Sequence, residues 1–117
     1  GLTNKYTYKS IKKNAMCGDL IKIELISKNS KVNSMRYETE SCVLCEASAS
    51  LLSKKIKNLP IKNIKEDLKK LKNIHLNDSN LTFPKKFKDY KHLINEHNLN
   101  RLNCVYLPID AVLKALK

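Results

Sequence analysis

Apolar and polar side chains alternate along three stretches in the first forty residues. The alternation covers residues 5–9, 20–26 and 32–40, and the last two stretches are separated by a polar segment at 27–30. A period of two places successive side chains on opposite faces of a strand, and a short polar turn between two such stretches indicates antiparallel pairing. The pattern therefore predicts three strands, of which the last two form a hairpin.

After Cys42 the apolar positions follow the period of a helix. Leu52, Ile56 and Leu59 recur at helical spacing, and a run of alanines and serines at 47–50 precedes them. Small side chains at these positions would let this helix approach another backbone or a buried site closely.

Further helices are predicted along the rest of the chain. Pro60 suits the first position of a helix, whose apolar face consists of Ile61, Ile64, Leu68 and Leu71. Residues 73–83 are predicted to form a loop and residues 84–97 a weaker helix. Pro108 is predicted to begin a last helix with Ile109, Val112, Leu113 and Leu116 facing inward. Strands followed by helices predict an α+β fold, with a small antiparallel sheet of about three strands and amphipathic helices packed on it, in a single domain over 1–117.

The composition limits the functions that need to be considered. Of the 117 residues, 42% are hydrophobic and 29% are charged, so the chain can bury a core. Two glycines are too few for a glycine-rich nucleotide loop. No apolar run approaches the roughly 20 residues of a membrane span, and the start lacks the apolar centre of a secretion signal. We therefore expect no membrane association and a cytoplasmic location, or the stroma or matrix of an organelle.

The chain is strongly basic. Lysine and arginine number 23 against 11 acidic residues, for a formal net charge of +12. A basic chain suggests nucleic-acid binding, but the only arginines are Arg36 and Arg101, and no aromatic residue alternates with the lysines. Base readout and base stacking favour arginine and aromatic side chains. Solvated surface lysines are therefore the preferred interpretation, and a zinc-stapled basic nucleic-acid-binding module is the alternative.

Three of the four cysteines lie where predicted elements meet. Cys17 precedes the second strand, Cys42 lies where a strand gives way to a helix, and Cys104 lies shortly before the last helix. The partial positive charge of a helix N-terminus stabilises a thiolate, which is the form that binds metal or attacks sulfur. Asp19 can point the same way as Cys17 on an extended segment, and three thiolates with one carboxylate would form a closed zinc site. The alternative is four unrelated buried thiols.

Each of these cysteines belongs to a distinct motif. The motifs are NAMCGD at 14–19, SCVLCEASAS at 41–50 and RLNCVYLP at 101–108. With these motifs the chain resembles the iron–sulfur cluster assembly family of IscU, SufU and the N-terminal domain of NifU. The family pattern is an N-P-x-C-G-D, a G-C-x-x-x-x-A-S-A-S and a late cysteine before an apolar helix. The resemblance runs from about Lys12 to the end of the chain.

Within this family the chain is most similar to the SufU branch. The stretch from Cys42 to Cys104 is long, as the inserted helical region of SufU requires, and Asn103 stands where IscU-type scaffolds have a histidine. The resemblance implies a zinc-dependent acceptor of persulfide sulfur. Such a protein works with a SufS-like cysteine desulfurase and a downstream iron–sulfur scaffold, as a sulfurtransferase that is not a stand-alone enzyme.

The resemblance also assigns site residues by position. Cys17 would be the sulfur acceptor, and Arg101 would favour a thiolate or persulfide by its charge. The implied zinc ligands are Cys17, Asp19, Cys42 and Cys104. A different role in the same family is a scaffold that assembles a labile [2Fe–2S] cluster on the three cysteines.

Some residues depart from the family pattern. Ser41 replaces a glycine and would be strained there if the position requires a positive φ. Cys45 would lie one helical turn from Cys42, where it could be an alternative zinc ligand, a resolving thiol or a packing residue, and packing is preferred. The resemblance implies an N-terminal amphipathic helix, and we expect this sequence to lack it. The three histidines match no family position and are expected on the surface: His75, His92 and His97.

Overall fold

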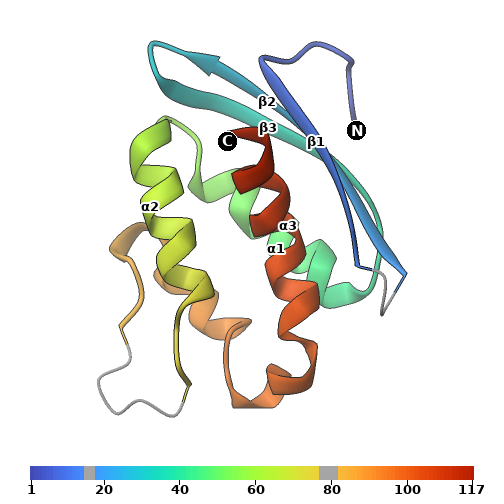
Figure 1. Cartoon of the computed structure of the whole chain (residues 1–117), viewed down its shortest axis with the longest axis vertical. Helices are drawn as coiled ribbons and strands as arrows, with labels where there is room; N and C mark the ends of the chain where they lie inside the picture. The colour runs from blue at the N-terminus through green and yellow to red at the C-terminus, as the bar shows by residue number, and fades with distance from the viewer. Residues whose placement is uncertain (15–17, 77–81) are drawn as a thin grey trace.

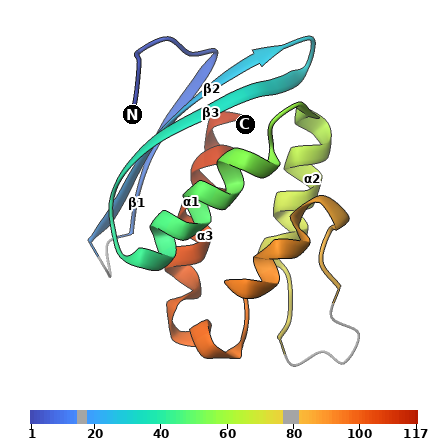
Figure 2. The same cartoon turned by 180° about the vertical axis from the view of Figure 1, so that it is seen from behind.

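The structure of the chain is a computed structural model that describes residues 1–14, 18–76 and 82–117. An antiparallel sheet forms one layer, and the helices pack against one of its faces (Figures 1 and 2). In the described residues the strands follow the order β1-β2-β3-β4 and span Tyr8–Asn14, Asp19–Lys28, Lys31–Glu40 and Leu59–Pro60. The predicted α+β fold is therefore confirmed.

The inner face of the sheet carries the predicted apolar positions. Ile21, Ile23 and Leu25 on β2 are at most 1% exposed, whereas Lys22 between them is exposed. Strand β2 pairs with β1 on one side and with β3 on the other. Its apolar residues therefore lie at the centre of the sheet, directly beneath the helices.

The β2–β3 hairpin closes through a two-residue loop. Asn29 and Ser30 have φ values of 56° and 62°, and Lys28 pairs with Lys31 on either side of them. Two consecutive residues with positive φ form the type I′ turn, whose twist matches that of the flanking strands. The polar turn predicted at 27–30 is thus confirmed and narrows to its last two residues.

The strand predicted at 5–9 is only partly correct, because β1 begins at Tyr8. The preceding segment is held by a side chain of β2. The backbone N–H groups of Thr3 and Asn4 donate to the two carboxylate oxygens of Glu24 at 2.8 and 2.9 Å. Asn4 adopts a φ of 62°, which bends the chain away from an extended course. These contacts bury Glu24 on the sheet face opposite the core.

Helices cover the inner face of the sheet. They are α1, α2 and α3, with two short 3-10 helices, η1 and η2, before α3; in this order they span Val43–Lys55, Ile61–Lys72, Leu102–Ala115, Lys85–His92 and Glu96–Arg101. Helices α1 and α3 pack against each other and against the sheet, and α2 lies beside α3 (Figure 1). The predicted apolar face of α2 is confirmed, since Ile64, Leu68 and Leu71 are fully buried.

Two predicted elements around the chain's middle differ from the structure. Leu59 was predicted to belong to the first helix, but it forms the short fourth strand with Pro60. Pro60 therefore precedes α2 instead of being its first residue. The weaker helix predicted at 84–97 is replaced by η1 and η2. Asn95 separates them with an extended backbone and accepts a hydrogen bond from the N–H of Asn98 at 3.2 Å, so it caps the second. Of the predicted loop, residues 77–81 lie outside the described part.

The predicted start of the last helix at Pro108 is wrong. Helix α3 begins at Leu102, and Pro108 lies inside it. An interior proline removes one helical hydrogen bond and typically costs about 3 kcal/mol. Starting the helix earlier buries Cys104 and Val105 against the core, and Pro108 itself is buried. The burial of apolar surface therefore outweighs the local preference of proline for a helix start.

Helices α1 and α3 approach closely at the run of small residues. The Ser48 hydroxyl donates to the Val105 carbonyl on α3 at 2.6 Å, and the Tyr90 hydroxyl donates to the Ser48 carbonyl at 3.0 Å. Ser48, Ala49 and Tyr90 are fully buried. The small residues at 47–50 thus serve helix contact, as predicted. This contact fixes the relative positions of the two helix N-termini.

Tyr90→Phe is expected to lower the free energy of unfolding by about 1–2 kcal/mol, because it leaves a buried carbonyl without one hydrogen bond. Urea denaturation monitored by circular dichroism measures the change. Tyr6→Phe is the matched control, since Tyr6 is 43% exposed and should change stability by less than about 0.5 kcal/mol. Equal effects of the two variants would contradict the structural role of Tyr90.

Alkaline pH is expected to destabilise the protein through the same tyrosine. Burial raises the pKa of Tyr90 above its ordinary value, so the unfolded chain ionises first as pH rises. The stability that the neutral, buried Tyr90 hydroxyl contributes is fully present below the unfolded pKa of about 10. It is lost progressively as the pH rises above that value. Denaturation midpoints between pH 8 and 11 should fall more steeply in the wild type than in Tyr90→Phe. Parallel curves would contradict this origin of the alkaline loss.

Candidate metal site

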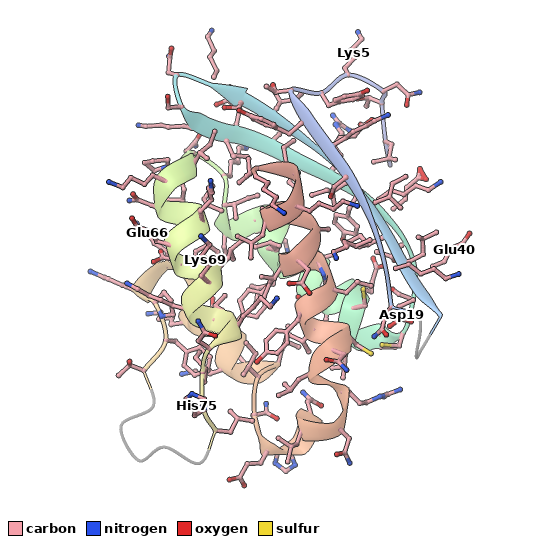
Figure 3. All side chains as sticks on the ribbon, in the orientation of Figure 1. Lys5, Asp19, Glu40, Glu66, Lys69 and His75 are labelled. Atoms are coloured by element: carbon pink, nitrogen blue, oxygen red, sulfur yellow. The ribbon has the colours of Figure 1, made fainter. Side chains whose placement is uncertain are left out.

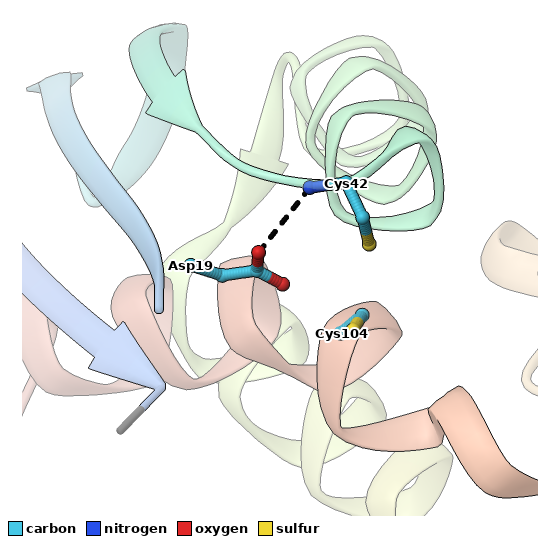
Figure 4. Close-up of side chains that lie close together, drawn as sticks. All are labelled: Asp19, Cys42 and Cys104. Carbon is cyan, nitrogen blue, oxygen red and sulfur yellow. Dashed lines mark hydrogen bonds between the residues drawn. The ribbon is translucent and has the colours of Figure 1, made fainter. Parts of the chain in front are cut away.

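Three side chains that are distant in sequence converge where β2, α1 and α3 begin. Asp19 is the first residue of β2, Cys42 precedes α1, and Cys104 lies in the first turn of α3. One carboxylate oxygen and the two sulfur atoms lie within 4.8 Å of one another (Figure 4). The structure therefore brings together three of the four predicted metal ligands. Cys17, the fourth, lies outside the described residues.

The carboxylate of Asp19 is held in place and only half satisfied by protein groups. Its Oδ1 accepts a hydrogen bond from the backbone N–H of Cys42 at 3.2 Å. Its Oδ2 is buried and has no hydrogen-bond partner within the described part of the chain. In Figure 4 this second oxygen lies on the side of the two sulfur atoms. A buried carboxylate is costly unless it is paired or binds a metal, so this oxygen is suited to a cation.

Each of the two thiols lies at the N-terminus of a helix. Cys42 is the N-cap residue of α1, with φ −72° and ψ 168°, and Cys104 is the third residue of α3. The unpaired N–H groups of a helix N-terminus carry partial positive charge, which favours a thiolate over a thiol. Two sulfurs and one oxygen in this field match the ligands that zinc takes in tetrahedral sites. The donor set therefore fits a metal ion, and Asp19 supplies the oxygen.

The turn before Asp19 depends on a glycine. Gly18 has a φ of +72°, and its N–H donates to the carbonyl of Asn14 at 2.8 Å. Asn14 and Asp19 are paired residues of β1 and β2. A left-handed residue at this point lets the chain turn so that β2 starts with Asp19 at the site. The sequence signal for this role is a glycine between two predicted strands.

The replacement of a family glycine by Ser41 introduces no left-handed strain. Ser41 is not among the described residues that have a positive φ, and those that are not glycine are Asn4, Asn29, Ser30 and Asn58. The condition under which serine would be strained is therefore not met.

Arg101 lies one helical turn before Cys104. It is exposed, occupies the N-cap position of α3, and makes no ion pair with any described residue. Its support of a thiolate or persulfide remains a prediction. The predicted surface positions of the histidines are confirmed, since all three are exposed: His75, His92 and His97.

Cys45 lies one helical turn from Cys42 and belongs to the core. It is fully buried, and the group of possible metal ligands among the described residues does not include it. Burial raises the pKa of the Cys45 thiol to about 11. A neutral buried thiol is a poor metal ligand and a poor nucleophile, which supports packing as its role.

Cys45 is therefore expected to resist alkylation in the native protein, whereas Cys42, which is partly exposed, should react once metal is removed by a chelator. Iodoacetamide labelling at pH 8 with peptide mass spectrometry measures both sites. In urea the two thiols should react at similar rates, which controls for intrinsic reactivity. Native labelling of Cys45 as fast as that of Cys42 would contradict its burial as a neutral thiol.

Comparison with known proteins agrees with this architecture. Residues 1–97 match the family model of the NifU-like N terminal domain. The N-terminal part of a nitrogen-fixing NifU-like protein from Brucella abortus is similar in structure, with a TM-score of 0.83 at 18% identity over 99% of this chain and 81% of that one. No curated protein sequence matches the chain significantly.

Two other solved structures are similar. One is SufU from Fervidobacterium islandicum AW-1, named as an iron–sulfur cluster assembly scaffold protein for the SUF system, with a TM-score of 0.74 at 19% identity over 100% of this chain and 85% of that one. The other is a hypothetical protein, with a TM-score of 0.79 at 15% identity over 99% and 85%. At such identities these structures show a common fold. Within the described residues, no helix is long and apolar enough to cross a membrane.

Proposed function

The chain belongs to the family of NifU-like N-terminal domains, and on that premise we propose that it is a SufU-type, zinc-dependent acceptor of sulfur in iron–sulfur cluster assembly. The observation that carries the proposal is the convergence of Asp19, Cys42 and Cys104 with one buried carboxylate oxygen that has no hydrogen-bond partner in the described residues. Cys17 completes the ligand set by its place in the NAMCGD motif. Asn103 beside Cys104, where a scaffold of the IscU type has histidine, supports the SufU assignment.

The residues of the site have separate tasks in this function. Asp19 holds its carboxylate toward the sulfurs through the N–H of Cys42, and Cys42 and Cys104 lie in the positive field of two helices. A zinc ion bound by these residues would keep their thiols deprotonated and hold the three elements together. Arg101 adds positive charge one turn from Cys104.

Cys17 accepts the sulfur in this proposal. Its thiolate attacks the outer sulfur of a persulfide on the cysteine of a desulfurase. The new bond joins Cys17 Sγ to that sulfur, the donor S–S bond breaks, and the donor cysteine leaves as a thiolate. One thiolate and one persulfide are present before and after the step, so it needs no oxidant or reductant. The persulfide on Cys17 is then available to a downstream iron–sulfur scaffold.

A desulfurase assay tests the proposal. The zinc-loaded protein should increase sulfide release by a SufS-like cysteine desulfurase in the presence of a thiol reductant, and Cys17→Ala should abolish the increase. Cys45→Ser is the matched cysteine control and should retain both zinc and the increase. A Cys17→Ala protein that stimulates as well as the wild type would overturn the assignment of the acceptor.

A scaffold that assembles a [2Fe–2S] cluster is the second candidate, because the structurally similar SufU from Fervidobacterium islandicum is named as a scaffold. The two candidates differ in the metal that the protein retains. Anaerobic purification should give a colourless protein with about one zinc per chain. A brown protein that contains iron and acid-labile sulfide would favour the scaffold.

A further inference from the structure

A groove lined by lysines runs along the outer side of α2 and α3. It has a volume of about 540 Å³, and its charged lining residues are Lys12, Lys65, Lys69, Lys72, Asp110, Lys114 and Lys117. Six lysines against one aspartate concentrate positive charge in one hollow. Figures 1 and 2 place α2 and α3 side by side, and Figure 3 labels Lys69 on α2.

The helical repeat explains the arrangement on α2. Lys65, Lys69 and Lys72 recur at spacings of four and three residues, so they share one face of the helix. That face adjoins the buried stripe of Ile64 and Leu68. The lysines therefore stand at the edge of the core, where their stems line the groove and their ammonium groups reach solvent.

Most of this charge is not neutralised by the protein. Lys72 pairs with Asp110, and the ammonium of Lys114 donates to the carbonyl of Ile11 at 3.1 Å. The other four lysines of the groove make no ion pair with any described residue. Like charges held close together repel one another, and an anionic partner relieves that repulsion.

The groove continues toward the metal site. A smaller hollow of about 280 Å³ shares Lys12, Lys72 and Asp110 with the groove and also reaches Asn14 and Asn103. Asn14 pairs with Asp19 across β1 and β2. Asn103 directly precedes Cys104 in α3. A partner seated in the groove can therefore extend to the edge of the site.

We propose that this lysine groove docks an acidic surface of the cysteine desulfurase that delivers sulfur to the site. The proposal rests on the proposed function for the identity of the exchange. The groove is lined by neither arginine nor an aromatic residue, and the smaller hollow adds a single aromatic side chain, Tyr106. Base readout and stacking favour arginine and several aromatic side chains, so this lining favours carboxylates as the partner groups. Charge complementarity of this kind steers association and sets orientation.

Binding of a labelled ten-residue glutamate peptide tests the groove directly. The triple variant Lys65→Gln, Lys69→Gln, Lys117→Gln should weaken binding about fivefold or more in fluorescence anisotropy. The matched control Lys85→Gln, Lys86→Gln, Lys88→Gln removes the same charge from exposed lysines of η1, outside the groove, and should change binding less than about twofold. Equal weakening by both triples, or no binding by the wild type, would overturn the proposal.

Cross-linking and a nucleic-acid probe complete the test. Carbodiimide coupling of the peptide should attach to Lys65, Lys69 or Lys117, as mapped by mass spectrometry, and attachment predominantly elsewhere would contradict the groove. A single-stranded DNA of the same charge should bind more weakly than the peptide. Tighter DNA binding that depends on the groove lysines would identify a nucleic acid as the partner and overturn the acidic-protein proposal.

The desulfurase assay separates this proposal from the proposed function. The groove triple should raise the concentration of this protein needed for half-maximal stimulation about fivefold, with unchanged maximal stimulation and zinc content. If both triple variants gave half-maximal stimulation at the same concentration as the wild type, the docking proposal would be overturned and the proposed function would stand. Peptide binding in the groove without any stimulation by the wild type would overturn the proposed function alone.

Discussion

Asp19→Asn is expected to lower the zinc affinity about 100-fold while changing the stability of the metal-free protein by less than about 1 kcal/mol. The amide oxygen of asparagine can still accept the hydrogen bond from the Cys42 N–H. It is neutral, however, and a much weaker zinc ligand than a carboxylate. In the metal-free protein, the substitution also removes a charge whose Oδ2 is buried without a hydrogen-bond partner in the described residues.

Competition with a chromophoric zinc chelator measures the affinity, and thermal melts with and without a chelator measure the two stabilities. Glu46→Gln is the matched control, because Glu46 is an exposed carboxylate in the first turn of α1 outside the cluster. An affinity that is unchanged in Asp19→Asn would show that Asp19 is not a ligand. A large loss of metal-free stability would show that its carboxylate is mainly structural.

Ser48→Val is expected to destabilise the protein by about 2–4 kcal/mol and to weaken zinc binding about tenfold. Valine cannot donate to the Val105 carbonyl, and its extra methyl group enters a contact that is fully buried between α1 and α3. These two helices carry Cys42 and Cys104 at their N-termini. A wider helix separation therefore moves two proposed zinc ligands apart although neither is changed.

Ser53→Val is the control for a serine of the same helix. The Ser53 hydroxyl donates to the Ser50 carbonyl of α1 itself at 2.8 Å and is only partly buried. Its replacement should cost less than about 1 kcal/mol and leave zinc affinity unchanged. Urea denaturation and chelator competition measure both variants. A Ser48→Val protein that binds zinc like the wild type would show that the helix contact does not position the ligands.

Some parts of the fold followed from local periodicity, and others required long-range packing. The alternation around Ile21, Ile23 and Leu25 was sufficient to predict a strand with one buried face, because a period of two places these side chains on the same side. Its place between β1 and β3 came from the structure. The end of the first helix could not be predicted in the same way. Leu59 fits the helical period, yet it belongs to β4 and pairs with Val32 of β3. The start of α3 at Leu102 likewise depends on a core formed by elements distant in sequence.

For the candidate site, too, the sequence indicated the residues and the packing of distant elements brought them together. The identities of Cys17, Asp19, Cys42 and Cys104 as candidate ligands came from three motifs in the sequence. Their spacing along the chain does not specify which atoms meet. The approach of Asp19, Cys42 and Cys104 results from β2 pairing and from the contact of α1 with α3.

Residue type and local spacing were sufficient to predict the α+β class, the apolar faces of the strands and of α2, and the basic charge. The candidate ligands came from the three cysteine motifs and the family that those motifs resemble. The tertiary structure was needed to show that one oxygen of Asp19 is buried beside two sulfurs and that Cys45, one turn away, belongs to the core. It also showed that lysines of β1, α2, α3 and the residue Lys117 after α3 share one groove. Burial and electrostatic proximity depend on distances between elements, and packing of the whole core sets those distances.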